Sequence, residues 1–278
     1  MRFRLLFAGW LTWSVCLTVS DIAIAQGLRV STDVYDIANS EQSAAPQVIS
    51  SSLTLIHNGR VYDYVYSADE VVVYDPVDRK FTVLNTARGL STRPTFEEIR
   101  HLLDSLRPKT EDYIREQLAG GNPQAKRIAE SLQFQMNPQF RQSFDPMKGQ
   151  LIMTSPSFTY RVETRKWADP EQVEKYLAYA DWTARLNAVL HPGSLFPEPR
   201  MALNAALRKQ NDRMPISVEL DLRPNETLRL RAQHQWTQQL SDEDHARIAR
   251  WEEILNSKTV KEIPFRNYQQ AMLISRSR

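Results

Sequence analysis

The feature that most constrains the fold of this chain is a strict alternation of apolar and polar residues in two neighbouring segments. Residues 216–222 carry Ile, Val, Leu and Leu at every second position, and residues 228–232 continue the pattern with Leu, Leu and Ala. A period of two is typical of a strand with one buried face. The turn at residues 224–226 then predicts a hairpin with Arg229 and Arg231 on its solvent side. The residues expected on its buried side are Ile216, Val218, Leu220, Leu228 and Leu230.

Eight further segments carry strand patterns. The Asn58-Gly59 pair is the strongest short signal for a hairpin turn, because both positions of such a turn need positive φ. The predicted strands are 28–37, 48–57, 61–66, 71–74, 81–84, 139–144, 151–154 and 158–164. With the first hairpin they make about ten strands, mostly in antiparallel order.

Helix signals lie between these groups of strands. Thr95 followed by Glu98 predicts a helix start, and Pro108 is expected to stop that helix before a second one over 110–119. Further helices are predicted from Pro123, over 170–190, over 201–207 and over 241–255. The combination predicts an α+β fold, in which a curved antiparallel sheet, shaped like half a barrel, wraps over helices.

The N-terminal segment predicts export. Two arginines are followed by an apolar run and then by Ala23-Ile24-Ala25, which is the pattern of a signal peptide cleaved between Ala25 and Gln26. An uncleaved anchor is the alternative. We therefore expect a bacterial periplasmic or secreted protein with no membrane span after cleavage. Residues 26–257 are expected to form a single domain, and residues 258–278 a loosely held basic tail.

Composition excludes several classes of function. Only 8 of 278 residues are glycine, which argues against glycine-rich phosphate loops. Cys16 is the only cysteine and lies in the signal, so the mature chain has no disulfide and no thiolate ligand. Without residues 1–25 the chain has 33 basic and 32 acidic residues, and this balance does not favour binding to nucleic acid.

No catalytic residue, metal site or cofactor is predicted. The motifs of serine nucleophiles and of helical zinc sites do not occur in the chain. His101 follows Glu97 on the polar side of its predicted helix. The alternating pattern of its strand predicts that His234 points inward as a core residue. The acidic cluster 242–245 fits the first turn of a helix, where carboxylates interact well with the helix dipole. Paired carboxylates of a hydrolase remain an open alternative, because their pairing is spatial.

The aromatic residues are the most suggestive candidates for a binding site. Several lie on strands that are apolar on both sides, which predicts more apolar surface than a two-layer core needs. Packing in an ordinary core is the alternative. The residues predicted to line an apolar ligand slot are Tyr62, Tyr64, Tyr66, Phe158, Tyr160 and Trp236.

Two resemblances accompany these patterns. The order of strands, helices and hairpins resembles that of LolA-like lipoprotein carriers, and this similarity implies an open barrel that binds acyl chains. Residues 61–88 and 176–204, with the stretch Trp-Thr-Ala-Arg-Leu-Asn at 182–187, resemble an uncharacterised family of bacterial secreted proteins. That second resemblance implies no activity.

Three functions follow as hypotheses. The first is a non-catalytic envelope protein that binds an apolar or lipidic ligand, such as a lipid or lipoprotein. The second is a structural or assembly factor that binds other envelope proteins. The third, less favoured because nucleophile motifs are missing, is a secreted hydrolase that uses carboxylates.

Overall fold

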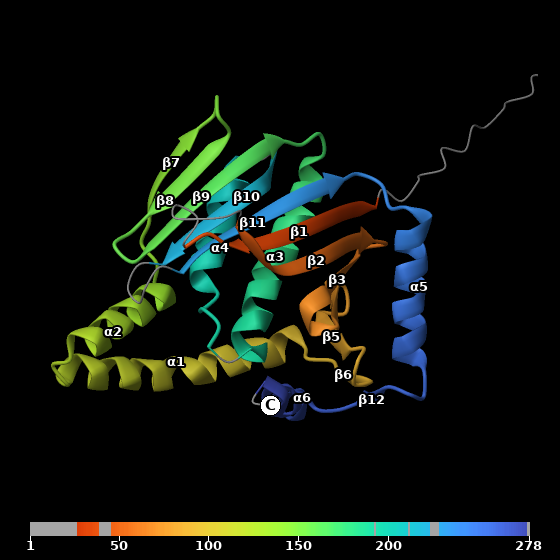
Figure 1. Ribbon diagram of the computed structural model, residues 1–278, viewed down its shortest axis with the longest axis horizontal. Coiled ribbons are helices and arrows are strands. Elements are labelled where there is room, and N and C mark those ends of the chain that lie inside the picture. Colours follow the sequence, from red (N-terminus) through yellow and green to blue (C-terminus); the bar gives the residue numbers. More distant parts are fainter. Residues whose placement is uncertain (1–26, 39–45, 192, 211, 223–227, 277–278) are drawn as a thin grey trace, which may run out of the picture.

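The computed structural model describes residues 27–38, 46–191, 193–210, 212–222 and 228–276. In this part of the chain, twelve strands form one open sheet in the order β12-β6-β5-β4-β3-β2-β1-β11-β10-β9-β8-β7. All neighbouring strands are antiparallel except β12 and β6. Six α-helices accompany the sheet (Figure 1). The predicted α+β class with an antiparallel sheet that does not close is confirmed. The predicted signal peptide and its cleavage site lie outside the described residues.

The first half of the sheet is a meander whose turns follow the sequence signals. Asn58 and Gly59 have φ of 49° and 77°, as a two-residue hairpin turn between β2 and β3 requires. A short 3₁₀ helix over Tyr66–Ala68 joins β3 to β4. The strands are β1 Leu28–Asp36, β2 Gln47–His57, β3 Arg60–Val65, β4 Glu70–Asp75, β5 Lys80–Asn85 and β6 Leu90–Thr92.

The second half of the sheet joins the first through β1 and β11. These strands pair antiparallel, so a strand from late in the chain lies beside the first strand. The remaining strands are β7 Arg141–Asp145, β8 Gln150–Thr154, β9 Phe158–Lys166, β10 Arg213–Leu222, β11 Leu228–Thr237 and β12 Lys261–Glu262.

The helices begin where side chains cap their free backbone N–H groups. Thr95, Asn122, Asp169 and Ser241 each accept hydrogen bonds from the first turn of the following helix. The helices are α1 Phe96–Ala119, α2 Pro123–Met136, α3 Pro170–Leu190, α4 Glu198–Arg208, α5 Asp242–Asn256 and α6 Phe265–Arg276. The acidic residues 242–244 lie in the first turn of α5, as predicted.

Helices cover both faces of the sheet. The inner face carries α3, which crosses it, together with α1, α4 and α6, and their apolar side chains form the larger core. The outer face carries α5, whose Ile248 and Trp251 pack on Leu53, Leu55 and Val73. Figure 1 shows α5 standing apart from the other helices at the edge of the molecule. None of the helices in the described residues combines the length and apolar content needed to cross a membrane.

The expected break at Pro108 is wrong, because α1 continues through this residue. Proline has no N–H, so the carbonyl of Asp104 loses its partner four residues later. Both residues are exposed, so water can hydrate that carbonyl. The estimate of about ten strands is also too low. It omits β6 and β12, which are too short to show an alternating pattern and pair with each other at the sheet edge.

The expectation of a loosely held tail is also wrong. The backbone N–H of Lys261 donates to the carbonyl of Gly89, and α6 then packs against the larger core. Phe265 and Tyr268 are buried there, and the Tyr268 hydroxyl donates to Glu70 at 2.9 Å. Their spacing of three residues places them on one helical face, a signal that the basic charge of the segment obscured.

The predicted division of the hairpin 216–232 into a buried side and a solvent side is confirmed only in part. Val218 is buried and Leu220 packs half-buried against the inner core. Ile216 lies in a bulge, where the register of β10 against β9 shifts. Leu228 is 43% exposed, so its predicted burial is wrong.

Replacing Tyr268 by alanine tests the docking of α6. We expect a loss of about 3–5 kcal/mol in the free energy of unfolding, because the ring is fully buried and leaves a cavity. The measurement is urea unfolding of the purified protein. Leu273→Ala is the matched control, since that side chain lies exposed on the same helix and should cost little. Equal costs at both positions would contradict the docking.

Candidate functional site

The six aromatic residues of the predicted slot do not come together. Tyr62 and Tyr64 face outward and pack on Trp251 of α5, with ring centroids 6.5 and 5.7 Å from it. Tyr66 lies 4.8 Å from Tyr64 and is exposed. The slot prediction placed these three residues in one cavity with Phe158, Tyr160 and Trp236, but the sheet separates the two groups.

Phe158, Tyr160 and Trp236 lie on the inner face. The rings of Phe158 and Tyr160 are both buried in the larger core. Trp236 is half-buried, with its ring 4.7 Å from Tyr176 of α3 and its Nε1 donating to the carbonyl of Pro215. Only this half of the predicted set is on the same side of the sheet as α3.

A row of polar side chains crosses the inner face, which is otherwise apolar. Strand register aligns one residue from each of six neighbouring strands, and five of the six are polar. Polar groups rarely occupy the inner side of a sheet unless they have partners or a role in binding. In order from β11 to β5 the row is His234, Thr32, Ser52, Val65, Glu70 and Asn85.

Asp63 lies in the adjacent row, beside Thr54. The Thr54 hydroxyl donates a hydrogen bond to the Asp63 carboxylate at 2.7 Å. The hydroxyl of Tyr179, on α3, donates a second hydrogen bond to this carboxylate. Burial raises the pKa of Asp63, and these two hydrogen bonds offset that rise in part. The Asp63 residue as a whole is half-buried.

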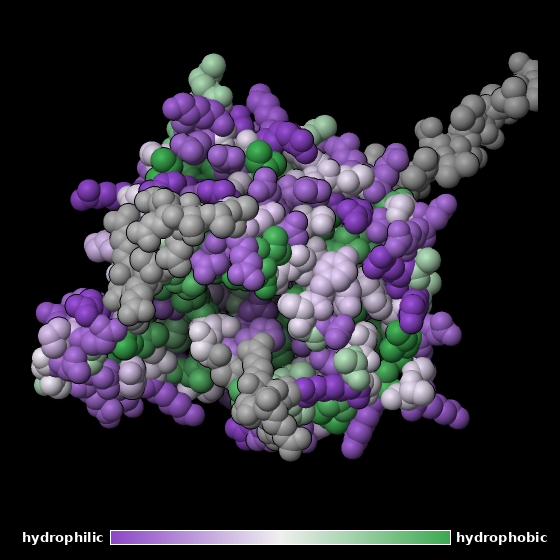
Figure 2. Space-filling model, viewed as in Figure 1, coloured by the Kyte–Doolittle hydropathy of each residue, from purple (hydrophilic) through white to green (hydrophobic). Residues whose placement is uncertain are grey.

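A second polar group of the inner face surrounds Arg200, near the start of α4. Its guanidinium donates a hydrogen bond to the hydroxyl of Tyr176. Its positive charge also favours a lower pKa for both Tyr160 and His234. The Nδ1 atom of His234 is 2.9 Å from the hydroxyl of Thr32. Figure 2 shows that the molecule is hollowed near its centre, over α3 and α4. Arginine, histidine and two tyrosines thus gather at one place on the inner face.

Beside the polar rows, the inner face holds an apolar cavity of about 850 Å³. It lies between the first half of α3 and the turns that end β2 and β4. The Tyr74 ring in its wall is 5.8 Å from the ring of Tyr179, which in turn bonds Asp63. Most of its apolar lining side chains come from strands and turns, and polar ones come from α3 and from the turn His57–Asn58. The lining residues include Ile56, Val61, Tyr74, Pro76, Val77 and Ala178, together with Asp169, Glu171 and Lys175.

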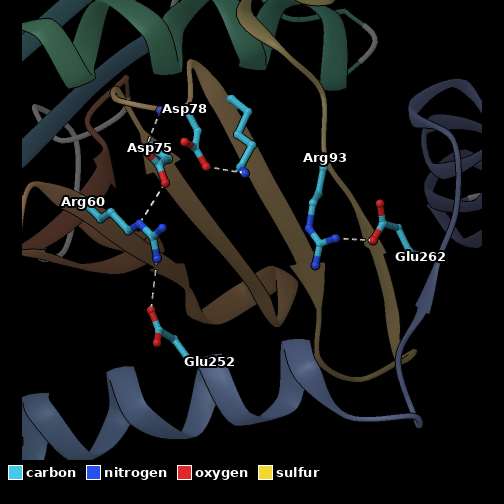
Figure 3. A network of polar contacts seen from close by, with 7 residues as sticks. Arg60, Asp75, Asp78, Arg93, Glu252 and Glu262 are labelled. Carbon is cyan, nitrogen blue, oxygen red and sulfur yellow. Dashed lines mark hydrogen bonds and ion pairs between the residues drawn. The ribbon is translucent and has the colours of Figure 1, made fainter.

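A second, more polar cavity of about 570 Å³ lies on the α5 side of the same turns. Arg60 at its edge points toward both Asp75 and Glu252, at 2.8 and 3.5 Å (Figure 3). His57 and His245 meet edge to face at 4.9 Å, and burial lowers the pKa of His57 more than the neighbouring His245 does. These contacts connect α5 to the strand ends, which suffices to explain them structurally.

The sequence analysis did not identify Asp63 or Arg200 as candidate functional residues. Asp63 lies between two tyrosines of a strand, and the one available signal was its parity, which places it on the same side as Val61 and Val65. Arg200 is one of many basic residues, and only the packing of α4 brings it to the sheet. His101 is exposed on α1, in agreement with the solvated polar face predicted for it.

Comparisons with known proteins identify no relative. No protein-family model matches the chain, and no curated protein matches it. In the described part of the chain, no group of three or more His, Cys, Asp or Glu side chains is placed to hold a metal ion. The function therefore has to be inferred from the geometry of the inner face.

Replacing Asp63 by asparagine should change how stability depends on pH. Because burial raises the pKa of Asp63, the folded protein holds this proton more tightly than the unfolded chain does. The carboxyl therefore contributes stability at low pH that is lost as the pH rises through its raised pKa. Between about pH 4 and about pH 8, the urea midpoint of the variant should fall less than that of the parent.

Asp104→Asn, at an exposed position on α1, is the control for that measurement. It should leave the pH dependence of the urea midpoint unchanged. A steeper fall for Asp63→Asn than for the parent protein would contradict the assigned direction of the pKa shift.

Proposed function

We propose that this protein is an exported, non-catalytic envelope protein that binds an apolar or lipidic ligand on the inner face of its sheet. The observation that carries the proposal is the cavity of about 850 Å³ beside α3. Binding sites for small molecules have volumes of this order and mostly apolar walls with a few polar groups. The cavity has both properties, since its charged residues come from the first turns of α3. The element order that resembles LolA-like carriers agrees with this role.

The ionisation of the inner face favours binding over catalysis. A general acid or base works best with a pKa near the working pH. Burial raises the pKa of Tyr160 to about 12 and lowers that of His234 to about 3. Near neutral pH both groups are therefore uncharged and poorly suited to exchange protons. They still offer hydrogen bonds to a ligand.

Partner binding is a second candidate, and one edge of the sheet favours it. β7 ends the strand order and pairs only with β8. Its residues Arg141, Gln142 and Ser143 are exposed, so an extended segment of another envelope protein could add as a further strand. The strand is short and polar, however, which is also how proteins protect such edges from pairing.

Filling the cavity tests the proposed function. Ala178 lies on α3 in the cavity wall, and Ala178→Trp should occupy the space that a ligand needs. The uncharged fluorophore N-phenylnaphthylamine should bind the mature protein, and this variant should bind it at least about tenfold more weakly, the loss of roughly 1.4 kcal/mol. Native mass spectrometry of protein purified from its host should also show bound lipid.

Asn187→Trp is the matched control, because this residue is exposed on the same helix. It adds the same ring and should leave the affinity unchanged. Circular dichroism should show that both variants remain folded. If the parent protein binds neither the fluorophore nor a lipid, the ligand-binding role is wrong and the edge of β7 becomes the better candidate.

A further inference from the structure

Among the residues that the structure describes, Arg200 makes no ion pair with a carboxylate. Its side chain is half-buried at the start of α4, and its interactions within the described residues are with Tyr160, Tyr176 and His234. None of these partners is negatively charged near neutral pH. A guanidinium keeps its charge in proteins, and moving it out of water is costly unless a counter-charge is present. The position is therefore suited to a negatively charged ligand.

His234 provides the second, independent observation. Its Nε2 atom is buried and has no hydrogen-bond partner among the described residues. When the Thr32 hydroxyl donates to Nδ1, the ring proton lies on Nε2 and a donor is left unused. A buried donor without a partner is costly in a folded protein. A ligand oxygen at this position would remove that cost.

The walls around these donors are aromatic. The ring of Tyr176 lies 6.4 Å from His234 and 4.7 Å from Trp236, and Trp236 lies 5.9 Å from Trp167. Tyr160 lies on β9, on the other side of β10 and β11 from the meander. His234 and Tyr176 thus lie beside aromatic rings that an apolar ligand body could contact.

We propose that Arg200, His234 and Tyr176 form a binding site for the carboxylate of a small organic acid with an aromatic or apolar body. A planar carboxylate matches the fork of a guanidinium and has a free oxygen for the Nε2–H of His234. Arg200 is the one cation in this group of residues, which favours a single negative charge. The site is separate from the apolar cavity of the proposed function and does not depend on it.

Asp63 does not serve as the counter-ion of Arg200. Its carboxyl is held by Thr54 and Tyr179, and it makes no ion pair with Arg200. Because burial raises its pKa, its negative charge is itself disfavoured. The charge of Arg200 therefore remains available to a ligand.

A matched pair of ligands tests the site. Para-fluorobenzoate and para-fluorobenzamide share their shape, but only the first is charged, and fluorine NMR reports the binding of each to the mature protein. We expect the acid to bind at least about tenfold more tightly than the amide, as a charge-assisted hydrogen bond predicts. Arg200→Gln should abolish this preference, and Arg200→Lys should retain part of it.

Two controls keep the result specific. Arg141→Gln removes an exposed arginine of β7 and should leave the preference intact. Ala178→Trp should also leave the preference for the acid intact. Arg200→Gln should in turn leave the binding of N-phenylnaphthylamine intact. The failure of one site can therefore be distinguished from the failure of the other. Equal affinity of the parent protein for acid and amide, no binding of either, or a preference that survives in Arg200→Gln would overturn the proposed carboxylate site. Tighter competition by phenyl phosphate than by benzoate would overturn the assignment to a carboxylate.

Discussion

Apolar residues on both faces of one sheet require cover on both sides, and most of this structure follows from that requirement. Strand β3 shows it directly, since Val61 points into the larger core and Tyr62 into the smaller one. The helix that covers the outer face, α5, comes from late in the chain and is held by Arg60 and Glu252. The inner face is larger and needs several helices.

The helices of the inner face do not fill it completely, and the gaps have different chemistry. Where α3 begins, its side chains stand off from the strand ends and leave the apolar cavity. Further along, Tyr176 and Tyr179 pack their rings in the larger core, while the Tyr179 hydroxyl is hydrogen-bonded to Asp63 of β3 and the Tyr176 hydroxyl to Arg200 of α4. One helix therefore borders an apolar cavity at its start and polar partners further along.

The charges of the inner face are close to one another but not paired. Burial raises the pKa of Asp63, and its carboxyl is hydrogen-bonded to Thr54 and Tyr179, whereas Arg200 interacts with Tyr176 and makes no ion pair among the described residues. A fully structural role would favour either an ion pair or apolar residues at these positions, because an uncompensated charge lowers stability.

The sequence by itself determined the local structure of this protein. Alternation fixed most strands, Asn58-Gly59 fixed a hairpin turn, and Asp169-Pro170 fixed the start of α3, because each signal acts between residues close in the chain. The sequence also predicted one slot lined by six aromatic residues. Only the tertiary structure decided which face each of them occupies, since the pairing of β1 with β11 joins the two halves into one sheet with Tyr62 on its outer face and Tyr160 on its inner face. The same pairing brings Thr32 to His234, and the packing of α4 brings Arg200 beside them, through contacts between segments far apart that no local pattern encodes.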